Sequence, residues 1–554
     1  MNVNKENKYV SSIESTTRPL NKFDQSCGLH TTFDSGKLIP IYLKEVLPND
    51  VRKLSWNSVL RLLTPKFPTM DNAKLDTFFF YVRNRDVFDL FPLVMGENPD
   101  PWAIKLETEI PTITIPLGEN FRSPGDLADY LGIPMFNNQS TSSGTVEVNA
   151  LPFRAVCKIW NDYFRDENYQ SNLYYPTNSA HVSYQKMTAT DSDVTRFVHT
   201  GSVCPPINRY KDYFSSCLPA PQKGKAVELP LGDYAPVVDG LTSDPGAQFK
   251  LKLLNAPVGS KISPVFTPTS GTDGNYQEPD YIDMSSETVI DANVHSRQYL
   301  RADLSAATAA SINSIRLAFQ SQRFLEQSAR GGTRYVELLA SMYGVTSPDL
   351  MLNRAQFLGG KSFPVSITPV TDVGSNLGNV GGMSNTVSGD YAFKKHFNEH
   401  GFIIGFAAVR TDRSYSQGIE PLWFRKSKLD YYFPVFSHIG EQPVLKREIY
   451  AGIPSRNDEV FGYREAWNEY RFSFNKCTGY MRSGITDSLN AWTYSDDYKA
   501  PPTLNSDWLT SQKELIDRTI TNPNKMQFIA DFWFNDTLYS VVTKTSAPGL
   551  IDHY

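Results

Sequence analysis

Prolines and glycines interrupt this sequence at short intervals along its whole length, with 36 prolines and 34 glycines among 554 residues. Many short apolar runs lie between them, and few stretches are long enough to form a helix. Strands separated by turn-forming residues produce this pattern. The pattern therefore predicts a mainly β fold with long loops, and the length allows one domain that carries large insertions.

Four segments have the hydrophobicity expected of strands. Lys37–Leu47 and Lys74–Val82 are apolar runs rich in β-branched and aromatic residues. Gly401–Val409 is almost continuously apolar, which is typical of a strand buried on both faces. Met526–Val542 contains two candidates, MQFIADFWF and LYSVV, and the polar pair Asn535-Asp536 predicts a break between them.

A few helices are also expected from apolar spacing, caps and stop signals. The predicted helices are Ser55–Leu63, which ends before Pro65; a short helix capped by Ser123 that stops at Gly132; Pro152–Glu167; Ser305–Arg330; and Arg334–Tyr343, which stops at Gly344.

The segment from residue 227 to residue 295 differs in composition from the rest of the chain. It holds ten acidic residues and three lysines, has no Arg, Trp or Cys, and is rich in Gly, Pro, Ser and Thr. Such a segment is either a long surface loop or a projecting module, and its length favours the module. We expect residues from about Asp239 to Asp291 to lie outside the main β fold and to bury their few apolar side chains against identical neighbours. These side chains are Phe249, Leu251, Leu253, Leu254, Val265 and Phe266. The chain accordingly divides into residues 1–226, 227–295 and 296–554.

Sequence motifs for catalysis and metal binding are largely missing. We find no nucleophile elbow, phosphate-binding loop, dinucleotide fingerprint or zinc-protease motif. His396 and His400 have the spacing of two metal ligands on a helix, but a closed zinc site needs four ligands, and no other ligand suggests itself. Cys217 has no His or Asn at a recognisable spacing, so a small buried residue is the better interpretation. We therefore predict no catalytic site, no metal and no cofactor.

The five cysteines and the charge also limit the possible functions. The cysteines form no CxxC pair, and an odd, sparse set fits a reducing cytoplasm better than a disulfide scaffold. No run of about 18 apolar residues occurs, so no membrane insertion is expected. The net charge of −5 means that any contact with nucleic acid must be local.

One local basic cluster is a candidate for such a contact. Arg425, Lys426 and Lys428 lie close to Tyr431–Phe433, and Lys5 and Lys8 lie on a polar N-terminal tail. Cations next to aromatic rings can hold phosphates and stack bases of single-stranded nucleic acid. The alternative is an ordinary surface with ion pairs, which remains the simpler interpretation for any single residue.

Several longer stretches closely resemble the major capsid protein of the Microviridae, in the gokushovirus branch. They follow one another in the same order over almost the whole chain, and the likeness is weakest at residues 97–150, 171–200 and 227–295. The matching stretches are Phe23–Phe33, Asp34–Ile41, Glu45–Pro48, Thr64–Asn72, Leu75–Val82, Trp160–Asn168, Asp212–Pro230, Arg316–Arg334, Gly440–Pro443 and Pro548–His553.

The resemblance implies an eight-stranded antiparallel jelly-roll β-barrel with long loop insertions and a few short helices. It further implies a structural protein that self-assembles into an icosahedral T=1 shell around a circular single-stranded DNA genome. The implied partners are other copies of the chain, a small basic DNA-packaging protein, a pilot protein, an internal scaffolding protein and a host cell-surface receptor. The implied location is the virion, assembled in the cytoplasm of a bacterial host. In this family the segment before the RLAFQ helix forms protrusions at the threefold axes, which suits a role in attachment.

Two other classes of function are compatible with a β-rich chain. A carbohydrate-binding β protein would use exposed aromatic residues as a sugar platform, and a hydrolase on a β scaffold would need a catalytic constellation. The missing constellation disfavours the hydrolase. A carbohydrate-binding protein would remain a monomer or a small oligomer, whereas a shell protein would form particles.

Overall fold

The computed structural model describes most of the chain outside the acidic segment. The described residues are 19–97, 109–137, 144–187, 191, 196–225, 227, 237–239, 300–302, 312–332, 334–346, 348, 353–371, 380–510, 512–523 and 526–545. The chain forms two compact units, one built from Met1–Gly224 with Phe324–Tyr554 and the other from Lys225–Arg323. In the second unit, β9 (Val237–Asp239) pairs with β10 (Leu300–Ala302). No helix within the described ranges is long and apolar enough to cross a membrane.

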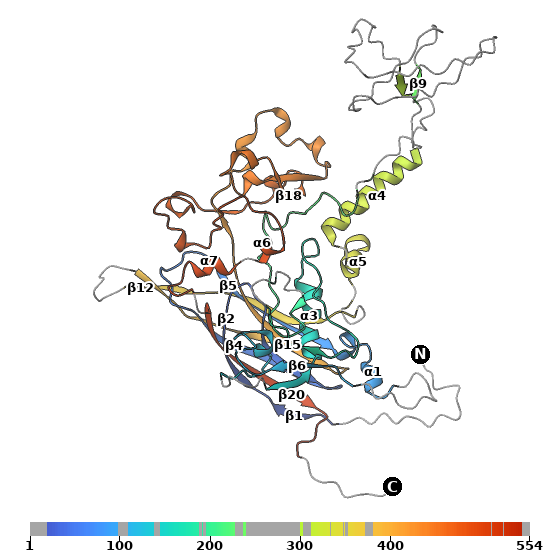
Figure 1. Cartoon of the computed structure of the whole chain (residues 1–554), viewed down its shortest axis with the longest axis vertical. Coiled ribbons are helices and arrows are strands. Elements are labelled where there is room, and N and C mark those ends of the chain that lie inside the picture. The colour runs from blue at the N-terminus through green and yellow to red at the C-terminus, as the bar shows by residue number, and fades with distance from the viewer. Residues whose placement is uncertain are drawn as a thin grey trace, which may run out of the picture. The chain divides into compact units, whose positions relative to one another are not determined.

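The first unit contains two antiparallel sheets that form its main core (Figure 1). In sheet I the order is β1-β20-β4-β14, and β2 also pairs with β20. In sheet II the order is β11-β5-β15-β3. Sheet I consists of β1 (Asn21–Asp24), β2 (Cys27–Phe33), β4 (Val51–Leu62), β14 (Thr386–His396) and β20 (Phe528–Ser540). Sheet II consists of β3 (Ile39–Val46), β5 (Ala73–Arg83), β11 (Gln356–Pro364) and β15 (Gly401–Thr411).

Aromatic rings join the two sheets face to face. Tyr42 of sheet II lies with its ring centroid 5.1 Å from that of Phe534 in sheet I, and Trp56 of sheet I packs edge-on against Phe363 at 5.7 Å. A buried ion pair between Arg52 and Asp536 lies in the same interior, where Tyr42 donates a 2.6 Å hydrogen bond to the carboxylate. The residues that alternate inward from both sheets therefore form one core, as in a β-sandwich.

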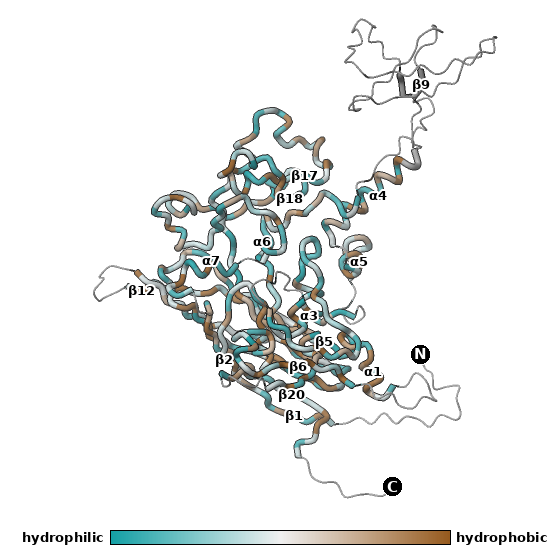
Figure 2. Tube along the Cα trace, in the orientation of Figure 1, coloured by the Kyte–Doolittle hydropathy of each residue, from teal (hydrophilic) through white to brown (hydrophobic). Residues whose placement is uncertain are grey.

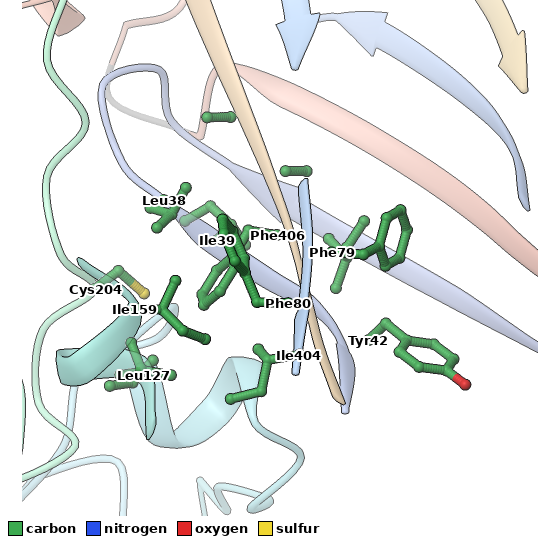
Figure 3. Close-up of a cluster of buried hydrophobic side chains, with 14 of the residues drawn as sticks. Leu38, Ile39, Tyr42, Phe79, Phe80, Leu127, Ile159, Cys204, Ile404 and Phe406 are labelled. Atoms are coloured by element: carbon green, nitrogen blue, oxygen red, sulfur yellow. The ribbon is translucent and has the colours of Figure 1, made fainter. Parts of the chain in front are cut away.

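Sheet II is covered on its other face as well. Side chains from α2 (Leu127–Tyr130) and α3 (Leu151–Ile159) pack there with Cys204 against strand residues such as Phe80, Ile404 and Phe406 (Figure 3). Every residue of β15 from Gly401 to Val409 is buried. This confirms the strand predicted from the continuous apolar run, and the two covers explain why the run has no polar alternation.

Sheet I has the opposite character, and here one prediction was wrong. Residues 55–63 were expected to form a helix, but residues 55–62 belong to β4, in which buried and more exposed residues alternate over twelve positions. Leu54, Trp56, Leu60 and Leu62 all point into the core. The spacing of Trp56 and Leu60 fits both the two-residue period of a strand and the 3.6-residue period of a helix. The segment forms a strand because it pairs with β14 on one side and β20 on the other.

The predicted break at Asn535-Asp536 was also wrong. β20 is one strand of 13 residues that runs through both halves of the apolar region. Asp536 is completely buried and ion-paired with Arg52, so the polar residue belongs to the core instead of ending the strand. Asn535 simply occupies an exposed position in the alternation.

The other predicted helices are present with adjusted ends. α3 continues into a π-helical turn at Trp160–Phe164, α4 covers Ile312–Gly331, and α5 covers Tyr335–Tyr343. α5 ends at Gly344 in the left-handed conformation (φ 66°), as the glycine predicted. The cap of α2 is Asp126 and not Ser123, because the Asp126 side chain accepts a hydrogen bond from the backbone N–H of Asp129.

Short elements complete the first unit. They are the sheet of β6 (Thr112–Pro116), β7 (Thr145–Asn149) and β8 (Val182–Ser183), the pairs β12 (Ile367–Thr371) with β13 (Val380–Ser384), β16 (Ser414–Tyr415) with β19 (Asn475–Lys476) and β17 (Glu441–Leu445) with β18 (Val460–Glu465), and the helices α1 (Phe91–Val94), α6 (Ser506–Thr510) and α7 (Lys513–Asp517).

Residues 414–510 and 209–218 form what we call the loop lobe, which has its own small core. This core contains Tyr213, Phe214, Cys217, Tyr415, Val444, Ile449, Phe461, Leu504, Trp508 and Leu509. Short 3-10 turns and two-stranded pairs make up most of the lobe. Figure 2 shows hydrophobic and hydrophilic stretches following each other closely around β17 and β18 in this lobe.

Candidate functional site

The structure separates the two histidines with metal-ligand spacing. His396 is the last residue of β14, and its Nε2 lies 2.8 Å from the Oδ1 of Asn49. His400 packs its ring edge-on against Phe91 at 5.9 Å. The two residues are therefore not on one helix. Among the described residues no group of three or more His, Cys, Asp or Glu side chains could hold a metal ion.

The cysteines are free thiols, and four of the five are buried. Burial raises the pKa of Cys204 to about 12 and raises the pKa of Cys157 and Cys217 further. A thiol with a raised pKa carries almost no thiolate at neutral pH and is a poor nucleophile. Cys217 is 2% exposed in the core of the loop lobe, which confirms its interpretation as a small buried residue.

One segment of the loop lobe exposes many large apolar side chains. We call it the aromatic loop surface. It is formed by Ile419, Leu422, Trp423, Leu429, Tyr431, Tyr432, Phe433, Val435 and Ile439. Trp423 is 73% exposed and Val435 is 87% exposed. Three 3-10 turns carry the segment, and two of them begin with a proline that fixes the backbone. Contiguous exposed apolar residues of this kind mark protein–protein contact surfaces.

The rest of the loop lobe holds the aromatic loop surface in place. The indole N–H of Trp467 donates a 3.1 Å hydrogen bond to the backbone carbonyl of Phe436, and the Trp467 ring packs against Tyr432 at 5.8 Å. Trp467 itself has a left-handed backbone (φ 64°), which is rare for a bulky residue. Arg425 is ion-paired with Glu469 at 3.2 Å. These contacts hold the exposed side chains in place before a partner binds, so less conformational entropy is lost on binding.

The predicted basic cluster is only partly free. The Arg425 guanidinium is occupied by Glu469 and by the ring of Tyr470, whose centroid lies 4.4 Å away. Lys426 and Lys428 are exposed. Two other basic residues of the lobe, Lys446 and Arg447, form ion pairs with Glu459 and Asp458 of the same lobe. Lys5, Lys8 and the six apolar residues predicted for the acidic segment lie outside the described residues.

A buried charge network holds the loop lobe together. Asp496 accepts hydrogen bonds from Arg413 at 2.8 Å and Arg209 at 3.2 Å, and Tyr498 donates to the same carboxylate. Burial raises the pKa of a carboxyl, but the two guanidinium groups outweigh burial and lower the pKa of Asp496 overall. The Arg209 guanidinium also stacks 3.8 Å from the ring centroid of Trp508.

Glu448 is the exception in this lobe. Burial raises its pKa to about 7, although the carboxylate accepts hydrogen bonds from the Leu445 backbone N–H and the Tyr213 hydroxyl. The side chain lies in a closely packed interior, and no catalytic partner is placed beside it in the described part of the lobe. The raised pKa is therefore a consequence of core burial.

These surfaces fit a structural protein, and comparison with known proteins decides the family. Residues 11–550 match the family model described as "Capsid protein (F protein)". The chain belongs to this capsid family. It is 35% identical to capsid protein VP1 of Bdellovibrio phage phiMH2K, over 97% of this chain and 96% of the relative. It is also 35% identical to capsid protein VP1 of Spiroplasma virus 4, over 94% and 93%, and 34% identical to that of Chlamydia phage 1, over 98% and 97%.

Membership of the capsid family confirms the central prediction from the sequence motifs. The chain is a structural capsid protein of the gokushovirus type and not an enzyme, and it is a component of the virion. The wider aromatic loop surface was not predicted from the sequence, where Tyr431–Phe433 were considered only as neighbours of the basic cluster. The signal was present as a run of large apolar residues that has neither strand nor helix periodicity.

Proposed function

We propose that many copies of this capsid protein self-assemble into a T=1 icosahedral shell around a circular single-stranded DNA genome. The observation that carries the proposal is the aromatic loop surface, which exposes nine large apolar residues within 21 positions of a capsid-family chain. Closed shells need repeated contacts between identical subunits, and rigid exposed rings are effective anchors for such contacts.

We further propose that the two sheets are the two halves of an eight-stranded jelly roll. This counts β1 and β2 as one interrupted edge strand, since both pair with the same side of β20. Four strands in each sheet and the orders β1/β2-β20-β4-β14 and β3-β15-β5-β11 support this topology. In such an arrangement the chain passes back and forth between the sheets, except that β5 and β11 are neighbours in sheet II, and long loops leave from the ends of the sandwich.

The shell proposal is tested by expressing the chain alone and with its internal scaffolding protein and then examining the products by negative-stain electron microscopy. Wild-type protein should give closed particles. The double variant Trp423→Ser with Val435→Ser should stay unassembled, because it removes the two most exposed apolar side chains of the surface. Wild-type protein that remains a monomer and binds sugar would favour the carbohydrate-binding alternative.

The genome is proposed to meet the basic residues Lys5, Lys8, Arg425, Lys426 and Lys428. Exposure of Lys426 and Lys428 supports their part in this proposal, whereas Arg425 already has a carboxylate partner. A small basic DNA-packaging protein and a pilot protein are the further partners we propose. Replacing all five cations by glutamine should lower genome packaging and its sensitivity to salt, and unchanged values would rule out these contacts.

The acidic segment is proposed to project from the outer surface and to meet a host receptor. Its charge suits a position away from packaged phosphates. Deleting Ser243–Ser286 with a short Gly/Ser bridge should leave shells intact, because loop length changes the closure entropy only slightly. Attachment to host cells should fall sharply. Normal attachment by the deleted particles would exclude the receptor role.

A further inference from the structure

The outward face of sheet I differs from every other sheet face in the core of the first unit. Its strands alternate between buried residues and residues that face away from sheet II. The second face of sheet II is covered by α2, α3 and nearby loops, whereas the outward face of sheet I carries exposed side chains on β2, β4, β14 and β20. Within the described residues, this face is therefore a broad surface of exposed side chains.

Trp533 occupies the middle of this face. It lies on the central strand β20, between Gly28 of β2 and Asn57 of β4, and it is 50% exposed. The indole lies over Gly28, because a Cβ at that glycine would come within 3.3 Å of the indole Cε3. Its N–H donates a 2.9 Å hydrogen bond to Asn535. One side of the ring thus rests on the glycine, and the hydrogen bond fixes its orientation.

On the other side of Asn57 the paired residue is again a glycine, and the Asn57 amide lies over it. Gly389 of β14 pairs with Asn57, and a Cβ there would come within 2.2 Å of the Asn57 Oδ1. Side chains larger than glycine on either edge would crowd the row that contains Trp533. The row therefore combines one large flat ring with small neighbours, which leaves room for a planar group on the ring.

Three exposed cations surround this row. Lys53 of β4 lies directly opposite Lys394 of β14, four residue pairs from the row of Trp533, and Arg61 lies opposite Ile529, four residue pairs from that row in the other direction. Like charges directly opposite each other on neighbouring strands destabilise a sheet. Within the described part of the chain none of the three is ion-paired with a carboxylate. An anion bound at this face would offset the repulsion.

The two carboxylates on the face are already engaged. Asp24 accepts hydrogen bonds from the backbone N–H and the hydroxyl of Ser26, and these bonds lower its pKa. Asp531 lies 3.2 Å from the Nδ1 of His30. At the end of the face where Asp531 lies, a groove of about 600 Å³ is lined by Arg61, Thr31, Thr32 and the pair His30–Asp531. Its hydroxyl and guanidinium donors suit phosphate or sugar oxygens.

From this juxtaposition we propose that the outward face of sheet I binds single-stranded DNA, with one base stacked on Trp533 and the neighbouring phosphates held by Lys53, Lys394 and Arg61. The inference rests on the proposed genome-enclosing function and adds a binding surface separate from the basic cluster of the loop lobe. An exposed ring flanked by unpaired cations is the arrangement that binds single strands without sequence preference. A duplex hides its base faces and could not use the ring.

The test uses the purified, unassembled full-length chain and a fluorescent oligo(dT) of about 12 nucleotides, a length within the usual site size. Trp533→Ala should weaken binding about tenfold, and Trp533→Phe should keep most of the affinity, because a smaller ring still stacks. Changing Lys53, Arg61 and Lys394 together to Gln should reduce the slope of log affinity against log salt by about 2.

Trp423→Ala is the matched control, because it removes an exposed tryptophan far along the chain from β20. This control should bind oligo(dT) like wild type but fail to form shells. Trp533→Ala should form shells that contain less DNA. Failure of shell formation by wild type would overturn the proposed function alone, since the solution binding assay does not need shells.

Three results would overturn the inference. One is wild-type affinity in both Trp533→Ala and the triple cation variant. Another is equal loss of binding in Trp533→Ala and Trp423→Ala. The third is binding by wild type only after residues 1–18 are removed, which would make that segment the occupant of the face. If Trp533→Ala fails to fold, as judged by its melting temperature, Trp533→Phe and the triple variant still decide the question.

Discussion

The core between sheets I and II and the core of the loop lobe are stabilised in different ways. The core between sheets I and II is apolar and contains few charged groups, among them the pair Arg52–Asp536. The smaller core of the loop lobe is surrounded by Arg209, Arg413 and Asp496, which are all buried. In the sheets the ladder satisfies the backbone, so side chains are free to be apolar. In the lobe, side chains must also satisfy loop carbonyls and hold the turns together.

The consequence is a different kind of stability. The sandwich depends mainly on the volume of its apolar side chains, and the lobe depends on completing a buried charge network. The lobe also carries the aromatic loop surface, so charge pairs in its interior support the proposed assembly contact. Four substitutions separate these two modes of stabilisation.

The largest effect is expected for Asp496→Ala in the lobe. The change leaves Arg209 and Arg413 buried without their carboxylate, which should cost about 3–5 kcal/mol of unfolding free energy. Urea unfolding followed by tryptophan fluorescence measures this loss. Asp531→Ala, on the exposed face of sheet I, is the control and should change stability by less than about 0.5 kcal/mol. Equal losses in both variants would contradict the role of the network.

A smaller but clear loss is expected for Ile404→Ala in β15. Ile404 is completely buried on the face of sheet II that α2 and α3 cover, so the change leaves a cavity and should cost about 3 kcal/mol. Ile529→Ala, at a 47% exposed position of β20, should cost much less. Similar losses at both sites would show that the outward face of sheet I is covered in solution.

Glu448→Gln should instead stabilise the lobe at neutral and higher pH. The folded-state pKa of about 7 lies above the reference value of 4.5, so the folded state holds the proton more tightly. Wild-type stability should therefore fall as the pH rises from about 4.5 to 7, and Glu448→Gln should remove this slope and gain about 2 kcal/mol at pH 8. Urea unfolding at pH 5 and pH 8 measures the difference.

Glu459→Gln provides the control for the pH experiment. Hydrogen bonds from Arg456 and Lys446 lower the pKa of Glu459 to about 2, so this carboxyl is ionised in both states between pH 5 and pH 8. Its removal should leave the pH slope in that window unchanged. A slope that survives in Glu448→Gln would assign the pH dependence to another group.

The smallest effect is expected for His396→Ala at the end of β14. The ring is exposed, and its hydrogen bond with Asn49 is the interaction that the change removes. Stability should change by less than about 0.5 kcal/mol, and the metal content of the purified protein should be the same as in wild type. Stoichiometric zinc that disappears in the variant would show a metal site after all.

Parts of the sandwich were predictable from the sequence because burial on two faces leaves a simple signal. Gly401–Val409 shows it, and the turn at Gly344 was predictable for an equally local reason. β4 was not, because Trp56 and Leu60 fit a helix as well as a strand until the neighbouring strands are known. Asp536 was misread as a break for the same reason, since its partner Arg52 lies 484 positions away.

The loop lobe was much harder to predict. Its turns have no period, and its core joins Tyr213 and Phe214 to residues more than two hundred positions later. The capsid family was recognisable from ordered motifs, yet these motifs do not reveal which side chains face outward. The aromatic loop surface and the row around Trp533 depend on three-dimensional neighbours, such as Gly28 beneath the indole.

The pairing of β20 has a consequence for the synthesis of the protein. Sheet I places this strand between β1/β2 and β4, so Asn21 pairs with Ser540. During synthesis, β2 and β4 leave the ribosome long before β20 is made. Until then, the edges of β2 and β4 that pair with β20 have no hydrogen-bonding partner. The sandwich can close only after the chain has emerged beyond residue 540. A prematurely terminated product lacks this central strand, so we expect it to leave sheet I incomplete and not to fold into an assembly-competent subunit.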